Sequence, residues 1–272
     1  MSRDVGGVAG GGRHKGERMD TTDIARLRQA VQLAPDDMET QLTFLQALVT
    51  ADAWQEADEI GTALLHLPSP PAAVHALMAV VYSKCQRLGD AVQQGRQALE
   101  GHPDDALLLF NLGTLLAQQG DTDAALDYLD KAVAQREDWA EAHYNRGTVL
   151  LRQKRYREAI TAFEHALEHQ ETYPEAYFSR GNAHAMLGLD ADGTLDYYEL
   201  DCAINAYKTA IQQRPGYTAA LYNLGMLYGR MTSSEGLRVW EQYLDASADR
   251  PAEDTWRLRA QEYKRDLQDR VR

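Results

Sequence analysis

The sequence predicts an all-α fold, a solenoid of stacked antiparallel helix pairs. Alanine recurs every 34 residues, glycine recurs separately with the same period, and the segments between them have the apolar spacing of amphipathic helices. Only 8 prolines occur in 272 residues, which favours long helices over a turn-rich β fold. The hydrophobic content of 44% is enough for a core that continues along such an array.

Small residues mark the repeat in three series, each with a step of 34. The series are Ala57, Ala91, Ala125 and Ala159; Ala98, Ala132 and Ala166; and Gly113, Gly147 and Gly181. In the best-defined unit, Gly147 and Ala159 lack bulk, so the helices predicted at 140–153 and 156–169 can approach closely. Phe163 is expected to fill the space between neighbouring hairpins.

Six helix pairs and two terminal elements are expected. The first helices of the pairs are predicted near 38–50, 71–85, 105–118, 139–152, 173–187 and 217–230. Residues 1–19 are Gly-rich and predict a disordered tail, 20–250 the repeat array with a half repeat at its start, and 251–272 a C-terminal capping helix. Residues 15–18 can be encoded by a purine-rich stretch like a bacterial ribosome-binding site, which suggests the hypothesis that Met19 is the true start.

The repeated segments resemble a known family. NLGTLLAQQGDTDAALDYLDKAV (111–133), YNRGTVLLRQKRYREAITAFEHAL (144–167) and AINAYKTAIQQRP (203–215) are similar to tetratricopeptide (TPR) repeats, and the resemblance covers roughly residues 20–270. It implies a right-handed superhelix whose inner wall, lined by first helices, grips a peptide or helix of a partner protein. It also implies a non-catalytic scaffold or adaptor. Arg146 and Arg180, where leucine is usual, resemble many bacterial repeats, so a bacterial source is expected.

Inner positions of the first helices carry aromatic rings and amides, which suit peptide recognition because a ring covers a side chain while an amide bonds to backbone groups. The candidate groove residues are Phe110, Asn111, Thr114, Tyr144, Asn145, Thr148, Arg152, Phe178, Asn182, Tyr222 and Asn223. Alternatively, some of these side chains only pack between adjacent first helices. The less polar Gln46, Val80 and Lys84 of the earlier repeats predict a non-binding end.

The period breaks once, because Gly181 and Gly225 are separated by 44 residues instead of 34. Ten extra residues therefore enter the turn of the fifth pair, within GLDADGTLDYYE (188–199). This stretch contains the Asp-x-Asp-Gly-Thr signature of haloacid-dehalogenase-type phosphatases. The nucleophile of those enzymes follows a buried strand, whereas NAHAMLG predicts a helix here, so the match is judged spurious and no enzyme is predicted.

The insertion also resembles an EF-hand calcium loop. Asp190, Asp192, Asp196 and Glu199 would take the third, fifth, ninth and twelfth positions, and Gly188 stands where the first aspartate is normal. Calcium would therefore bind weakly, and no other cofactor is expected. The sequence favours the alternative, an acidic surface loop that folds onto the basic turn of Arg152, Lys154, Arg155 and Arg157.

The formal charge of −13 argues against nucleic acid and anionic membranes as partners. No apolar run is long enough to span a bilayer, and the N-terminus lacks the hydrophobic segment of a secretory signal, so a cytoplasmic protein is expected. Cys85 and Cys202 have no spaced ligand partners for zinc. His165 and His169 share a helical face and could bind zinc, although a solvated pair is favoured.

Overall fold

The computed structural model describes residues 21–189 and 195–271, and it confirms the predicted all-α solenoid of stacked helix pairs. Throughout these residues every regular element is a helix, and the isolated bridge between Leu189 and Leu195 is the sole β-type pairing. The chain divides into two compact units, Met1–Glu137 and Asp138–Arg272. The predicted disordered tail, 1–19, lies outside the described residues.

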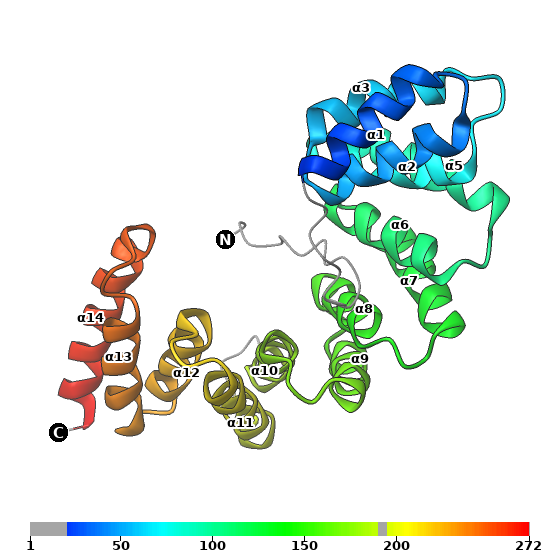
Figure 1. Ribbon diagram of the computed structural model, residues 1–272. Coiled ribbons are helices and arrows are strands. Elements are labelled where there is room, and N and C mark those ends of the chain that lie inside the picture. Colours follow the sequence, from blue (N-terminus) through cyan, green and yellow to red (C-terminus); the bar gives the residue numbers. More distant parts are fainter. Residues whose placement is uncertain (1–20, 190–194, 272) are drawn as a thin grey trace. The chain divides into compact units, whose positions relative to one another are not determined.

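Unit 1 contains a single helix followed by three helix pairs (Figure 1). Its helices are α1 Thr21–Leu33, α2 Met38–Thr50, α3 Trp54–Leu65, α4 Ala72–Lys84, α5 Leu88–Gly101, α6 Ala106–Gln119 and α7 Thr122–Gln135. The first helices of the pairs are α2, α4 and α6, and each begins and ends within one residue of its predicted segment.

Unit 2 contains three further pairs and a terminal helix (Figure 1). Its helices are α8 Ala140–Arg152, α9 Tyr156–His169, α10 Pro174–Gly188, α11 Tyr197–Gln213, α12 Thr218–Arg230 and α13 Glu235–Ala246, followed by the 3₁₀ turn η1 Pro251–Glu253 and α14 Asp254–Val271. The first helices here are α8, α10 and α12. Ala260 and Leu267 of α14 are buried in the core at this end of the unit.

Glycines of the first helices in unit 2 make room for a large ring of the second helix. A Cβ added to Gly147 would lie 2.6 Å from Phe163, one on Gly181 would lie 2.7 Å from Tyr207, and one on Gly225 would lie 2.8 Å from Trp240. Real Cβ contacts are longer than this, so the close packing of each pair requires glycine. Phe163 thus lies over Gly147 inside its own hairpin, and not only between hairpins as the sequence predicts.

In the first two pairs of unit 1 the small and large partners exchange places. Gly61 of α3 and Gly95 of α5 occupy second-helix positions where an aromatic ring stands in later repeats. The bulk comes instead from the following first helix: Met78 fills the space at Gly61, and Leu112 lies 3.2 Å from a Cβ added to Gly95. In these two repeats the glycine lies on the second helix and the large side chain on the following first helix, which is the reverse of the arrangement in unit 2.

A left-handed residue closes the turn within most pairs. Positive φ angles occur at Asp52 (58°), Gln86 (62°), Gly120 (98°), Lys154 (61°) and Thr232 (53°). The next residue donates its N–H back to a carbonyl of the preceding helix, as Arg155 does to Leu150 at 2.9 Å. This hydrogen bond is that of a Schellman motif, which ends the first helix and reverses the chain. In the fifth pair, the same position is Gly188, where the insertion replaces the turn.

Candidate functional site

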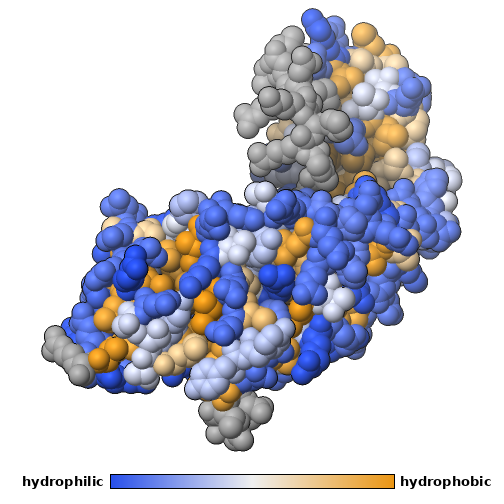
Figure 2. All heavy atoms as spheres, turned by 90° about the horizontal axis from the view of Figure 1, so that it is seen from below, coloured by the Kyte–Doolittle hydropathy of each residue, from blue (hydrophilic) through white to orange (hydrophobic). Residues whose placement is uncertain are grey.

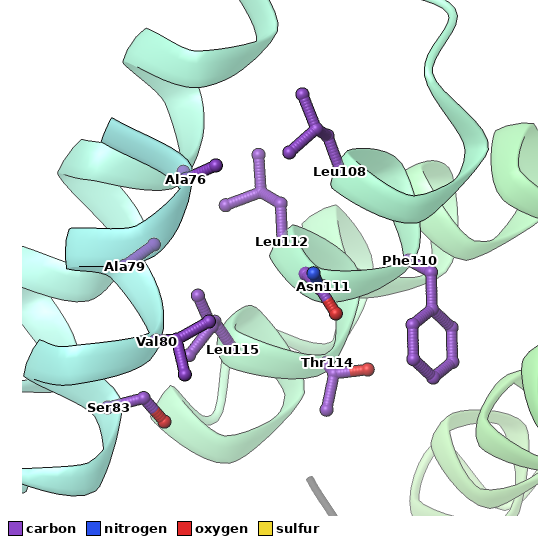
Figure 3. Close-up of a pocket in the computed structure, with 11 residues that line it drawn as sticks. Ala76, Ala79, Val80, Ser83, Leu108, Phe110, Asn111, Leu112, Thr114 and Leu115 are labelled. Atoms are coloured by element: carbon purple, nitrogen blue, oxygen red, sulfur yellow. The ribbon is translucent and has the colours of Figure 1, made fainter. Parts of the chain in front are cut away.

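Unit 1 has an apolar pocket on its first-helix face, between α4 and α6. Figure 3 shows Ala76 and Val80 of α4 turned toward Leu112 and Leu115 of α6. The complete lining is Ala76, Ala79, Val80, Ser83, Gly95, Leu108, Phe110, Asn111, Leu112, Thr114 and Leu115. Val80 and Leu108 are partly exposed, whereas Leu112 and Leu115 are buried beneath them. The partly exposed side chains give the pocket an apolar surface that a ligand can reach.

Three predicted groove residues meet at this pocket. Asn111 and Thr114 line it from α6 and remain partly exposed. Phe110 is only 4% exposed, and its ring points away from α4 in Figure 3, so it offers little surface to a partner. Val80, which the sequence assigned to a non-binding end, lies in the wall of the pocket beside Asn111.

The predicted aromatic residues of unit 2 connect successive hairpins. Tyr144 has its ring centroid 5.8 Å from that of Phe163 and 5.0 Å from that of Tyr173. Phe178 contacts Tyr207 and Tyr217 in the same way, at 6.0 and 5.2 Å.

Tyr222 makes the same kind of contacts. Its ring centroid lies 5.3 Å from that of Trp240 and 5.3 Å from that of Trp256. Each first-helix ring thus packs against the large ring of its own hairpin and an aromatic of the following one. All three rings are partly exposed, so an edge of each remains for a ligand.

Two predicted amides form a hydrogen-bonded pair across α10 and α12. Asn223 Nδ2 donates to Asn182 Oδ1 at 2.8 Å, and Tyr207 Oη donates to the same oxygen at 2.8 Å. Burial raises the pKa of Tyr207 above its ordinary value, so its hydroxyl remains a proton donor at neutral pH. Asn182 Oδ1 accepts both bonds, so the amide N–H₂ group of Asn182 and the second N–H of Asn223 are the donors that these two bonds leave to offer.

The remaining predicted groove residues lie on α8. Thr148 Oγ1 donates to the carbonyl oxygen of Tyr144 at 3.0 Å, so its proton is used within the helix. Asn145 is partly exposed, and Arg152 is exposed in the last turn. The structure therefore places Tyr144, Asn145, Thr148 and Arg152 along one helix, as predicted. They differ in how far their side chains are exposed to a ligand and in whether their polar groups already form hydrogen bonds.

The insertion has a narrow stem. Leu189 and Leu195 form a bridge, and the N–H of Asp196 donates to the carbonyl oxygen of Gly188 at 3.0 Å. The predicted calcium ligands Asp190 and Asp192 lie outside the described residues, and so does the whole of the phosphatase-like signature, 190–194. That signature follows α10, a helix, and not the strand that the phosphatase reaction needs.

The other two predicted calcium ligands serve helix α11 and its contact with α10. Asp196 Oδ1 accepts from the N–H groups of Tyr198 and Glu199, at 3.0 and 3.3 Å, as an N-cap. Glu199 is 9% exposed, and its Oε2 lies 2.7 Å from His184 Nδ1. No sequence pattern indicates this pair, because the two residues lie on either side of the insertion.

Polar and apolar surfaces alternate on the face shown in Figure 2. There hydrophobic residues form narrow groups between hydrophilic ones over much of the lower part of the view. Within residues 21–189 and 195–271, none of the helices combines the length and the apolar character that crossing a membrane requires.

Comparison with known proteins identifies the repeat. Family models described as tetratricopeptide repeat match residues 72–138 and 140–173, so the chain contains TPR repeats there. No curated protein sequence matches the chain significantly.

Several solved structures have the same fold. The crystal structure of MamA is 23% identical, with a TM-score of 0.57, and the match covers 63% of this chain and 95% of that one. MamA from Desulfovibrio magneticus RS-1, residue 41 to the end, is 21% identical with a TM-score of 0.57, covering 67% and 97%. YrrB, described as a TPR protein with an unusual peptide-binding site, is 23% identical with a TM-score of 0.56, covering 77% and 98%. At these identities the similarity shows the fold alone.

Proposed function

We propose that this chain is a non-catalytic scaffold that binds a peptide or helical segment of a partner protein on the exposed faces of its first helices. The observation that carries the proposal is the apolar pocket between α4 and α6, where partly exposed Val80 and Leu108 adjoin the amide of Asn111. An apolar anchor beside a hydrogen-bonding amide is the chemistry by which a protein segment is held. The peptide-binding site of YrrB, a protein of the same fold, supports this direction.

Unit 2 contributes a different chemistry to the proposed binding surface. Its first helices present the edges of Tyr144, Phe178 and Tyr222, and the amide pair of Asn182 and Asn223 joins two of these helices, α10 and α12. Aromatic edges and amide donors suit the backbone and side chains of a bound segment.

Selection of peptides from a random displayed library against the full chain tests the proposal. Selected peptides are then measured by fluorescence anisotropy against Val80→Glu, which places a charge in the pocket wall. We expect this variant to lose at least about 10-fold in affinity, the usual result of spoiling an apolar anchor. Leu33→Glu is the matched control, because Leu33 is 80% exposed on α1 and away from the pocket.

A second pair of variants tests the amide pair. Asn223→Ala should weaken binding several-fold, about the worth of one net hydrogen bond. Asn205→Ala, an exposed asparagine on the second helix α11, should leave binding unchanged. Selected peptides that are indifferent to both first-helix variants, or a library that returns no saturable binder, would refute the proposal. The bacterial source, the cytoplasmic location and the exclusion of nucleic acid stay predictions from the sequence.

A further inference from the structure

Two successive helix pairs of unit 2 carry the same combination of a carboxylate and an aromatic ring. Glu141 in the first turn of α8 and Glu175 in the first turn of α10 occupy equivalent positions of the repeat. Tyr173 and Tyr217, the N-cap residues of α10 and α12, are equivalent in the same way. Each tyrosine follows the second helix of the pair whose first helix carries the glutamate. The chain therefore contains two versions of one local arrangement, which can be compared directly.

In the fifth pair, α10 and α11, this arrangement holds an arginine. Arg214, the C-cap residue of α11, forms an ion pair with Glu175. Its guanidinium carbon also lies 4.7 Å from the ring centroid of Tyr217. A carboxylate attracts a guanidinium group by its charge, and an aromatic ring attracts it by the negative potential of its face. The fifth pair thus shows which kind of group the arrangement fits.

In the fourth pair, α8 and α9, the arginine is replaced. The residue equivalent to Arg214 is Gln170, the C-cap residue of α9, and its amide nitrogen donates to the carbonyl oxygen of Thr172 at 3.1 Å. Among the described residues, Glu141 Oε2 is buried and has no hydrogen-bond partner. A buried carboxylate oxygen without a partner costs free energy, which a cation beside it offsets. The fourth pair therefore keeps the carboxylate and the ring and lacks the positive charge.

We propose that Glu141 and Tyr173 bind a lysine or arginine side chain of the partner segment, an inference that rests on the proposed function. The cation takes the place that Arg214 takes in the next pair. The ring of Tyr144 borders this place, since its centroid is 5.0 Å from that of Tyr173. All three residues are partly exposed and Gln170 is exposed, so a side chain of another protein can reach them.

The charges around this place favour a cation. Burial raises the pKa of Tyr173 above its usual value, so its hydroxyl stays protonated at neutral pH. The nearby Tyr144, Glu141 and Glu175 raise this pKa further, because they disfavour another negative charge. The formal charge of −13 on the whole chain attracts a basic segment over a longer range. Since Tyr144 belongs to the proposed binding surface, the cation lies next to the aromatic edges that contact the rest of the segment.

Gln170→Arg tests the comparison of the two pairs without any peptide. The new guanidinium should pair with Glu141 and cover Tyr173, as Arg214 does in the next pair, and should raise the Tm by roughly 1–2 °C. The gain should vanish when Glu141→Gln is present as well. Gln29→Arg, at an exposed glutamine of α1, adds the same charge elsewhere and is the matched control. No gain, a gain that the control reproduces, or a gain that persists beside Glu141→Gln would contradict the proposed site.

Peptides selected from the displayed library measure the site directly. They should contain more lysine and arginine than the unselected library. Replacing the bound residue by its uncharged analogue, citrulline for arginine or norleucine for lysine, should weaken binding about 3- to 10-fold. Glu141→Gln should weaken binding of the charged peptide by the same factor and should not weaken binding of the uncharged one. Gln170→Arg should act like Glu141→Gln, because it fills the site from within the chain.

Glu164→Gln is the matched control for the loss of a carboxylate, because Glu164 is exposed on the second helix α9. It should leave peptide binding unchanged, and circular dichroism checks that each variant is folded. Selected peptides without basic residues, or basic peptides that bind Glu141→Gln as tightly as the original chain, overturn the cation site and leave the scaffold function standing. A library that returns no saturable binder refutes the proposed function and this inference with it.

Discussion

Gly147→Ala tests whether the close approach of α8 and α9 requires glycine. The added Cβ would lie 2.6 Å from Cε1 and 2.8 Å from Cδ1 of Phe163, a ring that is completely buried. Overpacking of a core costs about 1–3 kcal/mol. Alanine offsets part of this, because it stabilises a helix interior by about 0.5–1 kcal/mol relative to glycine. The net expectation is a loss of about 0.5–2 kcal/mol.

Urea denaturation followed by circular dichroism measures this loss as a lower midpoint with an unchanged slope. Gly229→Ala is the matched control, because no atom lies within 4 Å of the Cβ position at Gly229 in α12. That variant should be as stable as the original chain or slightly more so, since only the helix propensity changes. If Gly147→Ala is equally stable, the reasoning from steric contact fails.

A double-mutant cycle identifies the ring as the cause. Phe163→Leu shortens the group that faces residue 147, and Leu129 already stands opposite Gly113 in the preceding repeat. On this background Gly147→Ala should cost less than it does beside phenylalanine, with a coupling energy of about 1 kcal/mol. Equal costs on both backgrounds would show that the penalty arises elsewhere.

Three further predictions concern the turns, the buried tyrosines and the insertion. Lys154→Gly should stabilise unit 2 by about 0.5–1 kcal/mol in urea denaturation, because glycine adopts the φ of 61° at this position without the left-handed penalty. At the equivalent turn of unit 1, Gly120→Ala should be destabilising, because it introduces a Cβ where φ is 98°. Burial raises the pKa of Tyr217 to about 12, so between roughly pH 10 and 12 the unfolded chain releases a proton that the folded chain keeps. Stability should therefore fall as the pH rises through this range, and Tyr217→Phe should reduce the slope. Millimolar calcium should give no heat in calorimetry, since Asp196 caps α11 and Glu199 is paired with His184; saturable binding that Asp192→Asn abolishes would contradict this.

Much of the fold can be predicted from the sequence, because each repeat is built from residues that lie close together along the chain. The alanine and glycine series give the period, and helical spacing around Phe163 and Gly147 gives the pairs. Glycine at 120 also marks the end of α6, since it adopts the left-handed conformation at no steric cost. Asp52, Gln86, Lys154 and Thr232 take the same conformation without a comparable residue signal, because the return of the chain imposes it on them.

The candidate site was less predictable, because exposure depends on neighbours that the sequence does not place. Phe110 and Asn111 are adjacent in the sequence, yet the first is buried and the second lines an open pocket. Val80 appeared too apolar for binding, although apolar character is what the pocket between α4 and α6 provides. The rings of Tyr144, Phe178 and Tyr222 are largely engaged in contacts between hairpins, which was the stated alternative to a role in ligand binding.

The sequence by itself determined the period, the helix boundaries and the position of the insertion, because these follow from residue types at short and regular separations. Only the tertiary structure decided which side chains meet. It brings His143 to His165 and His169, Glu199 to His184, and Asn223 to Asn182, all across helices that pack side by side. Such contacts depend on the rotation of each helix about its axis and on its close approach to the next, and packing of the whole core fixes both.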